Sequence, residues 1–145
     1  MNTMRSYDFE GVVPAPPHDV WKAVTSPYVT SRLYFGMAAT SSWRAGSPIV
    51  VEPAAGPSDA ASSAAGRLSG EVLRAVPPRR LSFTLGAGDG QPATYVTWDI
   101  SAGDGGSRVR LVVDEPAGGA DEEGAQAWGT VFASLQAVLS GSPLR

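Results

Sequence analysis

The chain has no cysteine and a single histidine, His18, among its 145 residues. Without cysteine it can form no disulfide, no thiolate nucleophile and no zinc site with sulfur ligands. One histidine alone also provides no metal cluster, so we expect no metal and no cofactor. His18 stands where a short helix is expected to begin, and we interpret it as an exposed residue of that first turn. The alternative is a lone acid–base group at the mouth of a cavity.

Charge is scarce as well, with 17% charged residues and a net charge of −3. A nucleic-acid partner would require a basic stripe, and no run of Lys or Arg is longer than the pair Arg79–Arg80, so we expect no nucleic acid. No apolar stretch reaches the roughly 18 residues of a membrane-spanning helix, and the N-terminus has no apolar run of signal-peptide length. We therefore expect no membrane insertion and a cytoplasmic location. The 43% of apolar residues suffice for one globular domain over residues 1–145.

Candidates for catalysis are equally few. Most acidic residues lie in expected turns, in first helical turns or opposite the apolar face of a strand, and Asp114 and Glu115 are the pair that could line an opening. Tyr7, Tyr34 and Tyr95 are the aromatic groups with a reactive hydroxyl that could face inward. We therefore name no catalytic residue and lean towards a protein that is not an enzyme.

The first half of the chain alternates between strand and helix patterns. Residues 7–13 are apolar at every second position on one face, which predicts a half-buried strand. Residues 14–27, PAPPHDVWKAVTSP, place prolines before and after an apolar stripe of helical spacing, which predicts a helix of about two turns. Residues 29–35 predict a second short helix, with Leu33, Tyr34 and Phe35 as its buried end. Helices this short must pack against something larger.

The rest of the chain predicts a meandering sheet followed by one long helix. Strands are expected over residues 40–43, 47–52, 68–76, 81–85, 95–101 and 107–114, with a loop over 54–66. From Ala125 to Leu139 apolar residues recur at intervals of three and four, in a helix that Gly141 and Pro143 end. The fold class is therefore α+β: a curved antiparallel sheet of about six to seven strands around a long C-terminal helix, with two short helices after the first strand.

Five segments together resemble a known superfamily. They are PAPPHDVWKAVTSP, YFGMAATSSWRAGSP, GEVLRAVPPRRLSFT, YVTWDISAGDGGSRVRLVVD and AWGTVFASLQAVLSG, in this order along the chain. The first is similar to the A-P-P-x-x-V-W-x-A-(L/V)-T-x-P pattern of the START-like, or SRPBCC, superfamily. More narrowly, the chain resembles the branch named after the activator of the ATPase of the 90-kilodalton heat-shock protein. The resemblance implies a helix-grip fold with an internal cavity between the sheet and the last helix.

Apolar residues on the facing sides of sheet and helix are the candidates to line this cavity. We interpret Trp21 and Trp43 as core residues, whereas for Trp98 and Trp128 core packing and cavity lining are both open. An empty apolar pocket of about 300 Å³ would cost about 7 kcal/mol, so side chains, water or a ligand must fill it. The candidate ligand-binding residues are Phe9, Phe35, Phe83, Val96, Trp98, Ile100, Val109, Leu111, Trp128, Phe132 and Leu135.

Three functions are compatible with these residues. The first is a module that binds a hydrophobic, lipid-like small molecule without transforming it. The second is an enzyme of the polyketide cyclase or aromatase kind, as seen elsewhere in the superfamily. The third, implied by the name of the branch, is a co-chaperone that acts on an ATPase.

The last helix carries no charged residue between Gly124 and Leu144. Exposed helix faces usually carry charges. Small and polar residues occupy the side away from Trp128, so that side is either an uncharged solvated surface or the contact face of a homodimer. These residues are Gly129, Thr130, Ala133, Ser134 and Ala137.

Overall fold

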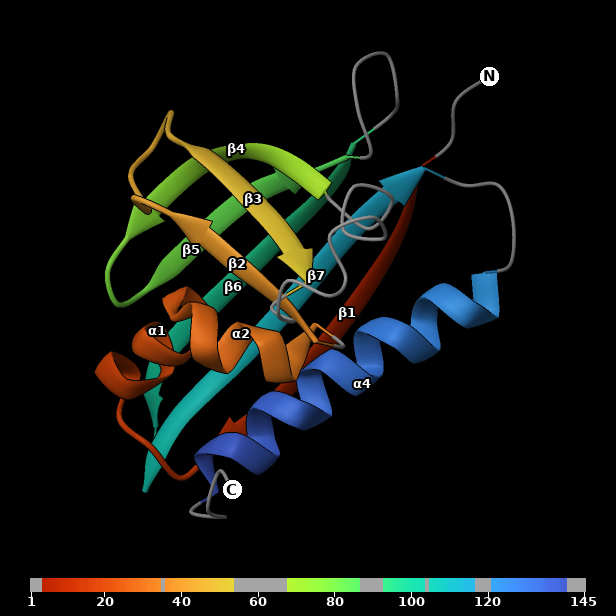
Figure 1. Cartoon of the computed structure of the whole chain (residues 1–145). Coiled ribbons are helices and arrows are strands. Elements are labelled where there is room, and N and C mark those ends of the chain that lie inside the picture. Colours follow the sequence, from red (N-terminus) through yellow and green to blue (C-terminus); the bar gives the residue numbers. More distant parts are fainter. Residues whose placement is uncertain are drawn as a thin grey trace.

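The computed structural model describes residues 4–34, 36–53, 68–86, 93–103, 105–116 and 121–140. The described chain runs from a strand through two short helices and six further strands to a long helix (Figure 1). The helices are α1 (Pro17–Thr25), α2 (Pro27–Leu33) and α4 (Asp121–Leu139). The strands are β1 (Met4–Val13), β2 (Met37–Ser41), β3 (Pro48–Pro53), β4 (Leu68–Val76), β5 (Arg80–Leu85), β6 (Thr94–Gly103) and β7 (Gly106–Pro116).

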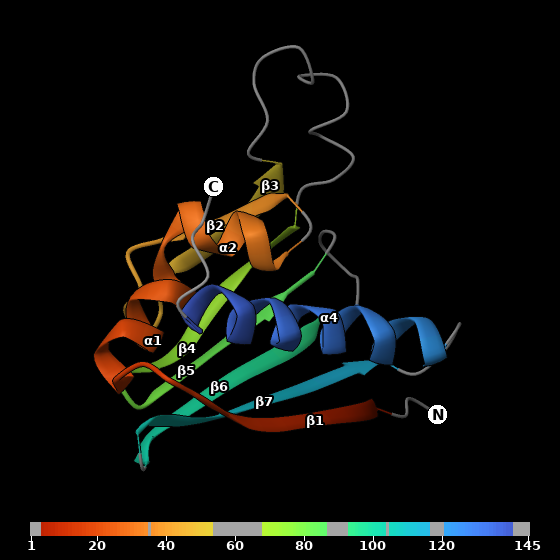
Figure 2. The same cartoon turned by 90° about the horizontal axis from the view of Figure 1, so that it is seen from below.

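All seven strands form one antiparallel sheet in the order β1-β7-β6-β5-β4-β3-β2. Six of these strands follow each other along the sheet in reverse chain order, while β1 pairs with β7 from the far end of the chain. The sheet curves around α4, which lies across one of its faces, and α1 and α2 lie beside the C-terminal half of α4 (Figure 2). The predicted α+β helix-grip fold is therefore confirmed.

The alternation of side chains explains which face of the sheet holds the core. On β6 the side chains of Val96, Trp98 and Ile100 are buried, and on β7 those of Val109 and Leu111 are buried while their neighbours point to solvent. Successive side chains of a strand point to opposite faces, so these residues all lie on the side covered by the helices. The core occupies the space between the sheet and the three helices.

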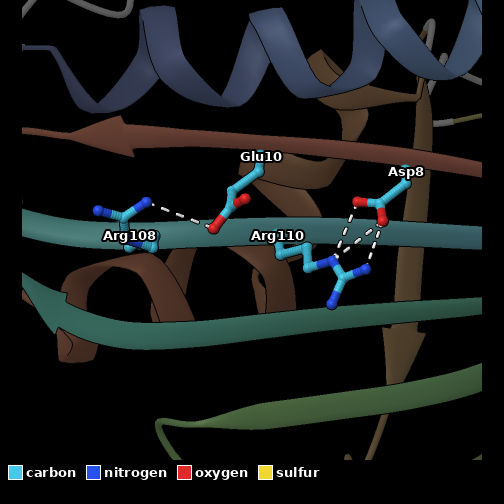
Figure 3. A network of polar contacts seen from close by, with 4 residues as sticks. All are labelled: Asp8, Glu10, Arg108 and Arg110. Atoms are coloured by element: carbon cyan, nitrogen blue, oxygen red, sulfur yellow. Dashed lines mark hydrogen bonds and ion pairs between the residues drawn. The ribbon is translucent and has the colours of Figure 1, made fainter.

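The opposite face of the sheet is charged, and its charges pair across strands (Figure 3). Arg110 of β7 bonds to both carboxylate oxygens of Asp8 on β1, and Arg108 forms an ion pair with Glu10 at 3.4 Å. The Arg110 guanidinium holds the pKa of Asp8 below its usual value. Exposed pairs of this kind contribute little to stability, because water screens their charges. Their main effect is to keep this face in water.

The junction of α1 and α2 shows what the prolines of the first half do. Pro17 occupies the first turn of α1, where its missing N–H is not needed. Ser26 ends α1 in an extended conformation and caps α2, its hydroxyl accepting from the N–H of Val29 at 3.5 Å. The second helix therefore begins at Pro27, two residues earlier than the sequence pattern predicts.

The first strand after the helices is also displaced from its prediction. We expected residues 40–43, but β2 spans Met37–Ser41. Trp43 lies beyond it at φ 58, a left-handed conformation that cannot continue a strand, and its N–H donates to the hydroxyl of Ser41 at 3.0 Å. The turn predicted over residues 44–46 is present, with Gly46 at φ 90. The loop predicted over residues 54–66 lies outside the described residues.

Candidate functional site

An apolar pocket of about 180 Å³ lies between the first half of α4 and one end of the sheet. Its walls come from six strands and helices: the end of α2, the start of β2, the middle of β3, the adjoining ends of β4 and β5, and α4. None of the lining residues is charged, and their polar side-chain groups are the hydroxyl of Tyr34 and the indole N–H of Trp128. The lining residues are Tyr34, Met37, Val51, Leu68, Leu85, Ala127, Trp128 and Val131.

Tyr34 connects this pocket to the core beneath it. Its ring meets Trp128 edge-on, with the ring centroids 6.4 Å apart and the planes at 72°. Only 6% of Tyr34 and none of Trp98 is exposed. The phenol oxygen of Tyr34 and the indole nitrogen of Trp98 are both buried and lack a hydrogen-bond partner among the described residues. Tyr34 therefore lies between the two tryptophans that the sequence singles out, touching Trp128 with its ring and approaching Trp98 with its hydroxyl.

Burial controls the ionisation of this phenol. It raises the pKa of Tyr34 to about 12, and the nearby Trp98 indole opposes this with a smaller lowering effect. The indole nitrogen is thus close enough to influence the phenol although the two atoms form no regular hydrogen bond. At neutral pH the hydroxyl keeps its proton and can act as a hydrogen-bond donor.

A carboxylate lies beside the other aromatic wall of the pocket. The indole N–H of Trp128 donates to Glu115 at 3.4 Å, and Glu115, near the end of β7, is half-buried. A group that approaches Trp128 therefore meets a negative charge. An apolar, uncharged lining with an acid at its border favours neutral occupants over anions.

Most of the residues predicted to line a cavity form the core instead. Their side chains pack together in the core between the sheet and the helices, whereas the apolar pocket lies beside the first half of α4. Of the predicted set, Trp128 borders the pocket, Phe35 lies outside the described residues, and Phe9 is half-buried and stacks on Phe132 with centroids 6.2 Å apart. The buried members are Phe83, Val96, Trp98, Ile100, Val109, Leu111, Phe132 and Leu135. A ligand-binding role for this set stays a prediction.

Sequence reasoning missed most of the pocket because its walls are strand ends. Leu68 begins β4 and Leu85 ends β5, and a bridge between Ser69 and Gly86 holds these ends together. Met37 in the same way begins β2. A pattern that identifies the buried face of a strand does not indicate which of its ends stays uncovered. Tyr34 is the exception, since the sequence marks it both as a buried helix end and as an inward-facing hydroxyl.

The other candidate polar groups lie away from the pocket lining. His18 is exposed at the start of α1, Tyr95 is 45% exposed, and Tyr7 is half-buried. Trp21 and Trp43 pack partly buried against the core, as their interpretation as core residues predicts. Within the described residues, no cluster of His, Asp and Glu could hold a metal ion. None of the described helices has the length and apolarity needed to cross a membrane.

The side of α4 that faces away from Trp128 carries the charge-free surface that the sequence indicates. Gln126, Thr130, Ala133 and Ala137 are exposed there, around a shallow hollow. Gly129 lies at the border of this surface, where an added Cβ would touch the ring of Phe9 at 3.4 Å. Self-association through this surface stays a prediction.

Comparison with known proteins places the chain in a family. A family model described as "Activator of Hsp90 ATPase homolog 1-like protein" matches residues 14–140. A search of curated proteins by sequence finds no match. CalU16 from Micromonospora echinospora superimposes with a TM-score of 0.71 at 21% identity, over 97% of this chain and 86% of that chain.

Two further solved structures share the fold. The Aha1 dimer from Colwellia psychrerythraea has a TM-score of 0.72 at 14% identity, over 95% of this chain and 98% of that chain. DynU16, from the dynemicin biosynthetic locus, has a TM-score of 0.68 at 23% identity, over 94% of this chain but 47% of that chain. The TM-scores show a common fold, and the family model covers most of the chain. The chain therefore belongs to the family of activator of Hsp90 ATPase homolog 1-like proteins.

Proposed function

We propose that this protein binds a small hydrophobic molecule in the pocket between α4 and the end of the sheet. The observation that carries the proposal is a pocket of about 180 Å³ beside the hydrophobic core, lined by apolar and aromatic side chains with no charged residue among them. If the pocket were enclosed and dry, about 24 cal/mol per Å³ would make it cost about 4 kcal/mol. That is a large part of the 5–15 kcal/mol that stabilises a typical domain, roughly. A bound apolar guest would offset this cost.

The size of the pocket limits the guest. Pockets for drug-sized ligands begin at about 300 Å³, whereas an engineered apolar cavity of about 150 Å³ accepts benzene. The pocket of about 180 Å³ therefore suits a single ring, or the end of a longer apolar molecule whose remainder stays outside. A lipid-like compound would enter by one end.

The alternative is an enzyme of the cyclase or aromatase kind. The structural likeness to DynU16, a protein from a biosynthetic locus, supports this alternative. Such an enzyme steers a reactive chain with inward-facing polar groups. Tyr34 is the one tyrosine candidate that lines the pocket. Its pKa of about 12 leaves the phenol protonated, so it can orient a guest but not remove a proton at neutral pH. This favours binding over proton-transfer catalysis.

The co-chaperone alternative follows from the family name and would use the outer surface. On the exposed face of the sheet, Arg110 and Arg108 already pair with acids of β1 (Figure 3). A partner that recognises charge would have to compete with these pairs. Stimulation of a chaperone ATPase by the purified protein is the measurement that would support this alternative.

A pocket-filling variant tests the binding proposal. Ala127 lines the pocket and Ala137 is exposed on the other side of the same helix, so Ala127→Leu and Ala137→Leu form a matched pair. We expect ethylbenzene to raise the melting temperature of the wild type and of Ala137→Leu, but not of Ala127→Leu. Native mass spectrometry of the purified wild type would in addition show a co-purifying guest. Equal stabilisation of all three proteins would place the binding elsewhere, and stabilisation of none would refute the proposal.

A further inference from the structure

Tyr34 and Trp98 together have two hydrogen-bond donors but one acceptor. A phenol has one O–H donor and an oxygen that accepts, whereas an indole has a donor and no acceptor. If the indole N–H of Trp98 donates to the phenol oxygen, the O–H of Tyr34 still needs an acceptor, and no described residue provides one. In every arrangement this pair is short of one acceptor. A buried donor without a partner costs about 1–3 kcal/mol, so such a shortage is uncommon unless something else supplies the acceptor.

The shortage occurs at the wall of the apolar pocket beside α4, which Tyr34 lines. Tyr34 lines this pocket with its ring and holds its hydroxyl against Trp98 beneath. Both polar atoms are covered in this arrangement, with less than 1 Å² of exposed surface each. The hydroxyl would reach a guest by rotation of the Tyr34 side chain towards the space that its ring already borders.

The surroundings also restrict the charge of the guest. Among the lining residues there is no Lys, Arg or His that could neutralise an anion. Glu115 is not itself a lining residue, but it accepts from the N–H of the lining residue Trp128 and so places a negative charge beside it. Burial of an unpaired carboxylate in such a place costs several kcal/mol, roughly. A fatty acid or another carboxylate entering head-first is therefore a poor match.

We propose that Tyr34 and Trp98 form a polar anchor for a neutral guest that carries one hydrogen-bond acceptor, such as a ketone, ester or ether oxygen. The inference rests on the proposed function and gives it a ligand class. Tyr34 donates its O–H to the guest after its side chain has rotated towards the pocket. The apolar remainder of the guest lies against Leu68, Leu85 and Val131.

The test compares two guests of similar shape, acetophenone and ethylbenzene, which differ mainly in a carbonyl oxygen. Their dissociation constants are measured on the wild type, on Tyr34→Phe and on the control Tyr95→Phe, whose hydroxyl is on an exposed side chain. One hydrogen bond changes affinity by about three- to tenfold. We expect the preference for acetophenone relative to ethylbenzene to fall by about this factor in Tyr34→Phe and to stay unchanged in Tyr95→Phe. Comparison of ratios removes the difference in solubility between the guests.

The possible outcomes distinguish a failure of the proposed hydrogen bond from a failure of the proposed binding site. If both guests bind and their ratio is the same in all three proteins, the anchor is wrong and the pocket remains a binding site. If neither guest binds the wild type, the proposed function fails and the anchor with it. Benzoate that binds as tightly as acetophenone would overturn the expectation of a neutral guest.

A second measurement needs no variant. A hydrogen bond to Tyr34 lowers the carbonyl stretching frequency of acetophenone bound to the wild type, relative to the same ketone in an alkane. An unshifted frequency in the bound state would contradict the anchor even if Tyr34→Phe did not fold.

Discussion

The buried phenol of Tyr34 predicts a specific loss of stability at alkaline pH. Its pKa rises from 10.0, the ordinary value, to about 12 in the folded protein because burial disfavours the charged form. In the unfolded chain the phenol would ionise near its ordinary value. Between these two values the unfolded state releases a proton that the folded state retains, so stability falls as pH rises. The contribution is fully present below pH 10 and is lost as pH passes through 12.

The magnitude follows from the two pKa values. Each unit of difference corresponds to about 1.4 kcal/mol, so a difference of two units amounts to about 3 kcal/mol, of which about half is lost by pH 11. Tyr34→Phe has no phenol proton at this position, so it should lose none of this stability as pH rises. It also lacks the unpaired hydroxyl, so at neutral pH we expect it to be at least as stable as the wild type. The free energy of unfolding of the variant minus that of the wild type should therefore increase by about 1.4 kcal/mol between pH 9 and pH 11.

Urea unfolding at pH 8, 9, 10 and 11, followed by far-ultraviolet circular dichroism, measures this difference. Other groups that titrate in this range are common to both proteins and cancel in the subtraction. Tyr95→Phe is the matched control, since Tyr95 is 45% exposed on β6, and its difference from the wild type should not change with pH in this way. A constant difference between Tyr34→Phe and the wild type from pH 9 to pH 11 would refute the argument that this phenol is buried and protonated.

Three further substitutions test other parts of the structure. Trp98→Ala removes a side chain with no exposed surface, and denaturant unfolding should show a loss of about 3–5 kcal/mol; a loss below 1 kcal/mol would contradict its central position. Gly70→Ala would place a Cβ 1.7 Å from a backbone oxygen of the neighbouring strand β5, so its melting temperature should fall clearly, and an unchanged value would show that β4 and β5 are further apart. Arg110→Gln should let the pKa of Asp8, followed by NMR, rise towards its usual value while the stability at neutral pH changes little. Since the pKa of Asp8 is lowered in the folded protein, its pair with Arg110 stabilises the fold above the pKa of the unfolded chain, and this stabilisation is lost as pH falls. If the free energy of unfolding falls equally in the wild type and in the variant as the pH is lowered, the pair is wrong.

The sheet and its buried face could be predicted because they follow from a local pattern. From Val96 to Ile100 on β6 and from Val109 to Leu111 on β7, the apolar side chains at every second position are buried and the residues between them are polar. A period of two is visible in the sequence whatever lies next to the strand. The long helix is visible for the same reason at a period near four.

The limits of the elements were less predictable because single residues decide them. Ser26 ends one helix and caps the next, and this double use moved the start of α2 to Pro27. Trp43 would be typical of a strand, yet its backbone is left-handed and ends the pairing that begins at Met37. Such choices depend on tertiary contacts of the turn, which propensity does not contain.

The sequence predicts a cavity between the sheet and the last helix, but not at which level of the helix it lies. The sequence leaves Trp98 and Trp128 open between core packing and cavity lining; in the structure Trp98 is buried in the core, whereas Trp128 borders the pocket. Whether two facing residues touch depends on how closely the helix approaches the sheet at that level, which a sequence pattern does not contain. The position of Tyr34 could be predicted, because a tyrosine at a buried helix end needs a polar partner or a cavity for its hydroxyl.

The pairing of β1 with β7 has a consequence for how the protein is made. Within the described sheet β1 is an edge strand whose one neighbour is β7, and the bond from Arg110 to Asp8 spans 102 positions of sequence. At a synthesis rate of about 5–20 residues per second, the first strand waits roughly 5 to 20 seconds for its partner to emerge. During that interval the half-apolar segment from Tyr7 to Val13 has no native strand to join. Completion of the fold is therefore a late event that closes the two ends of the polypeptide onto each other, and a nascent chain of this kind is exposed to capture or misassembly for most of its synthesis.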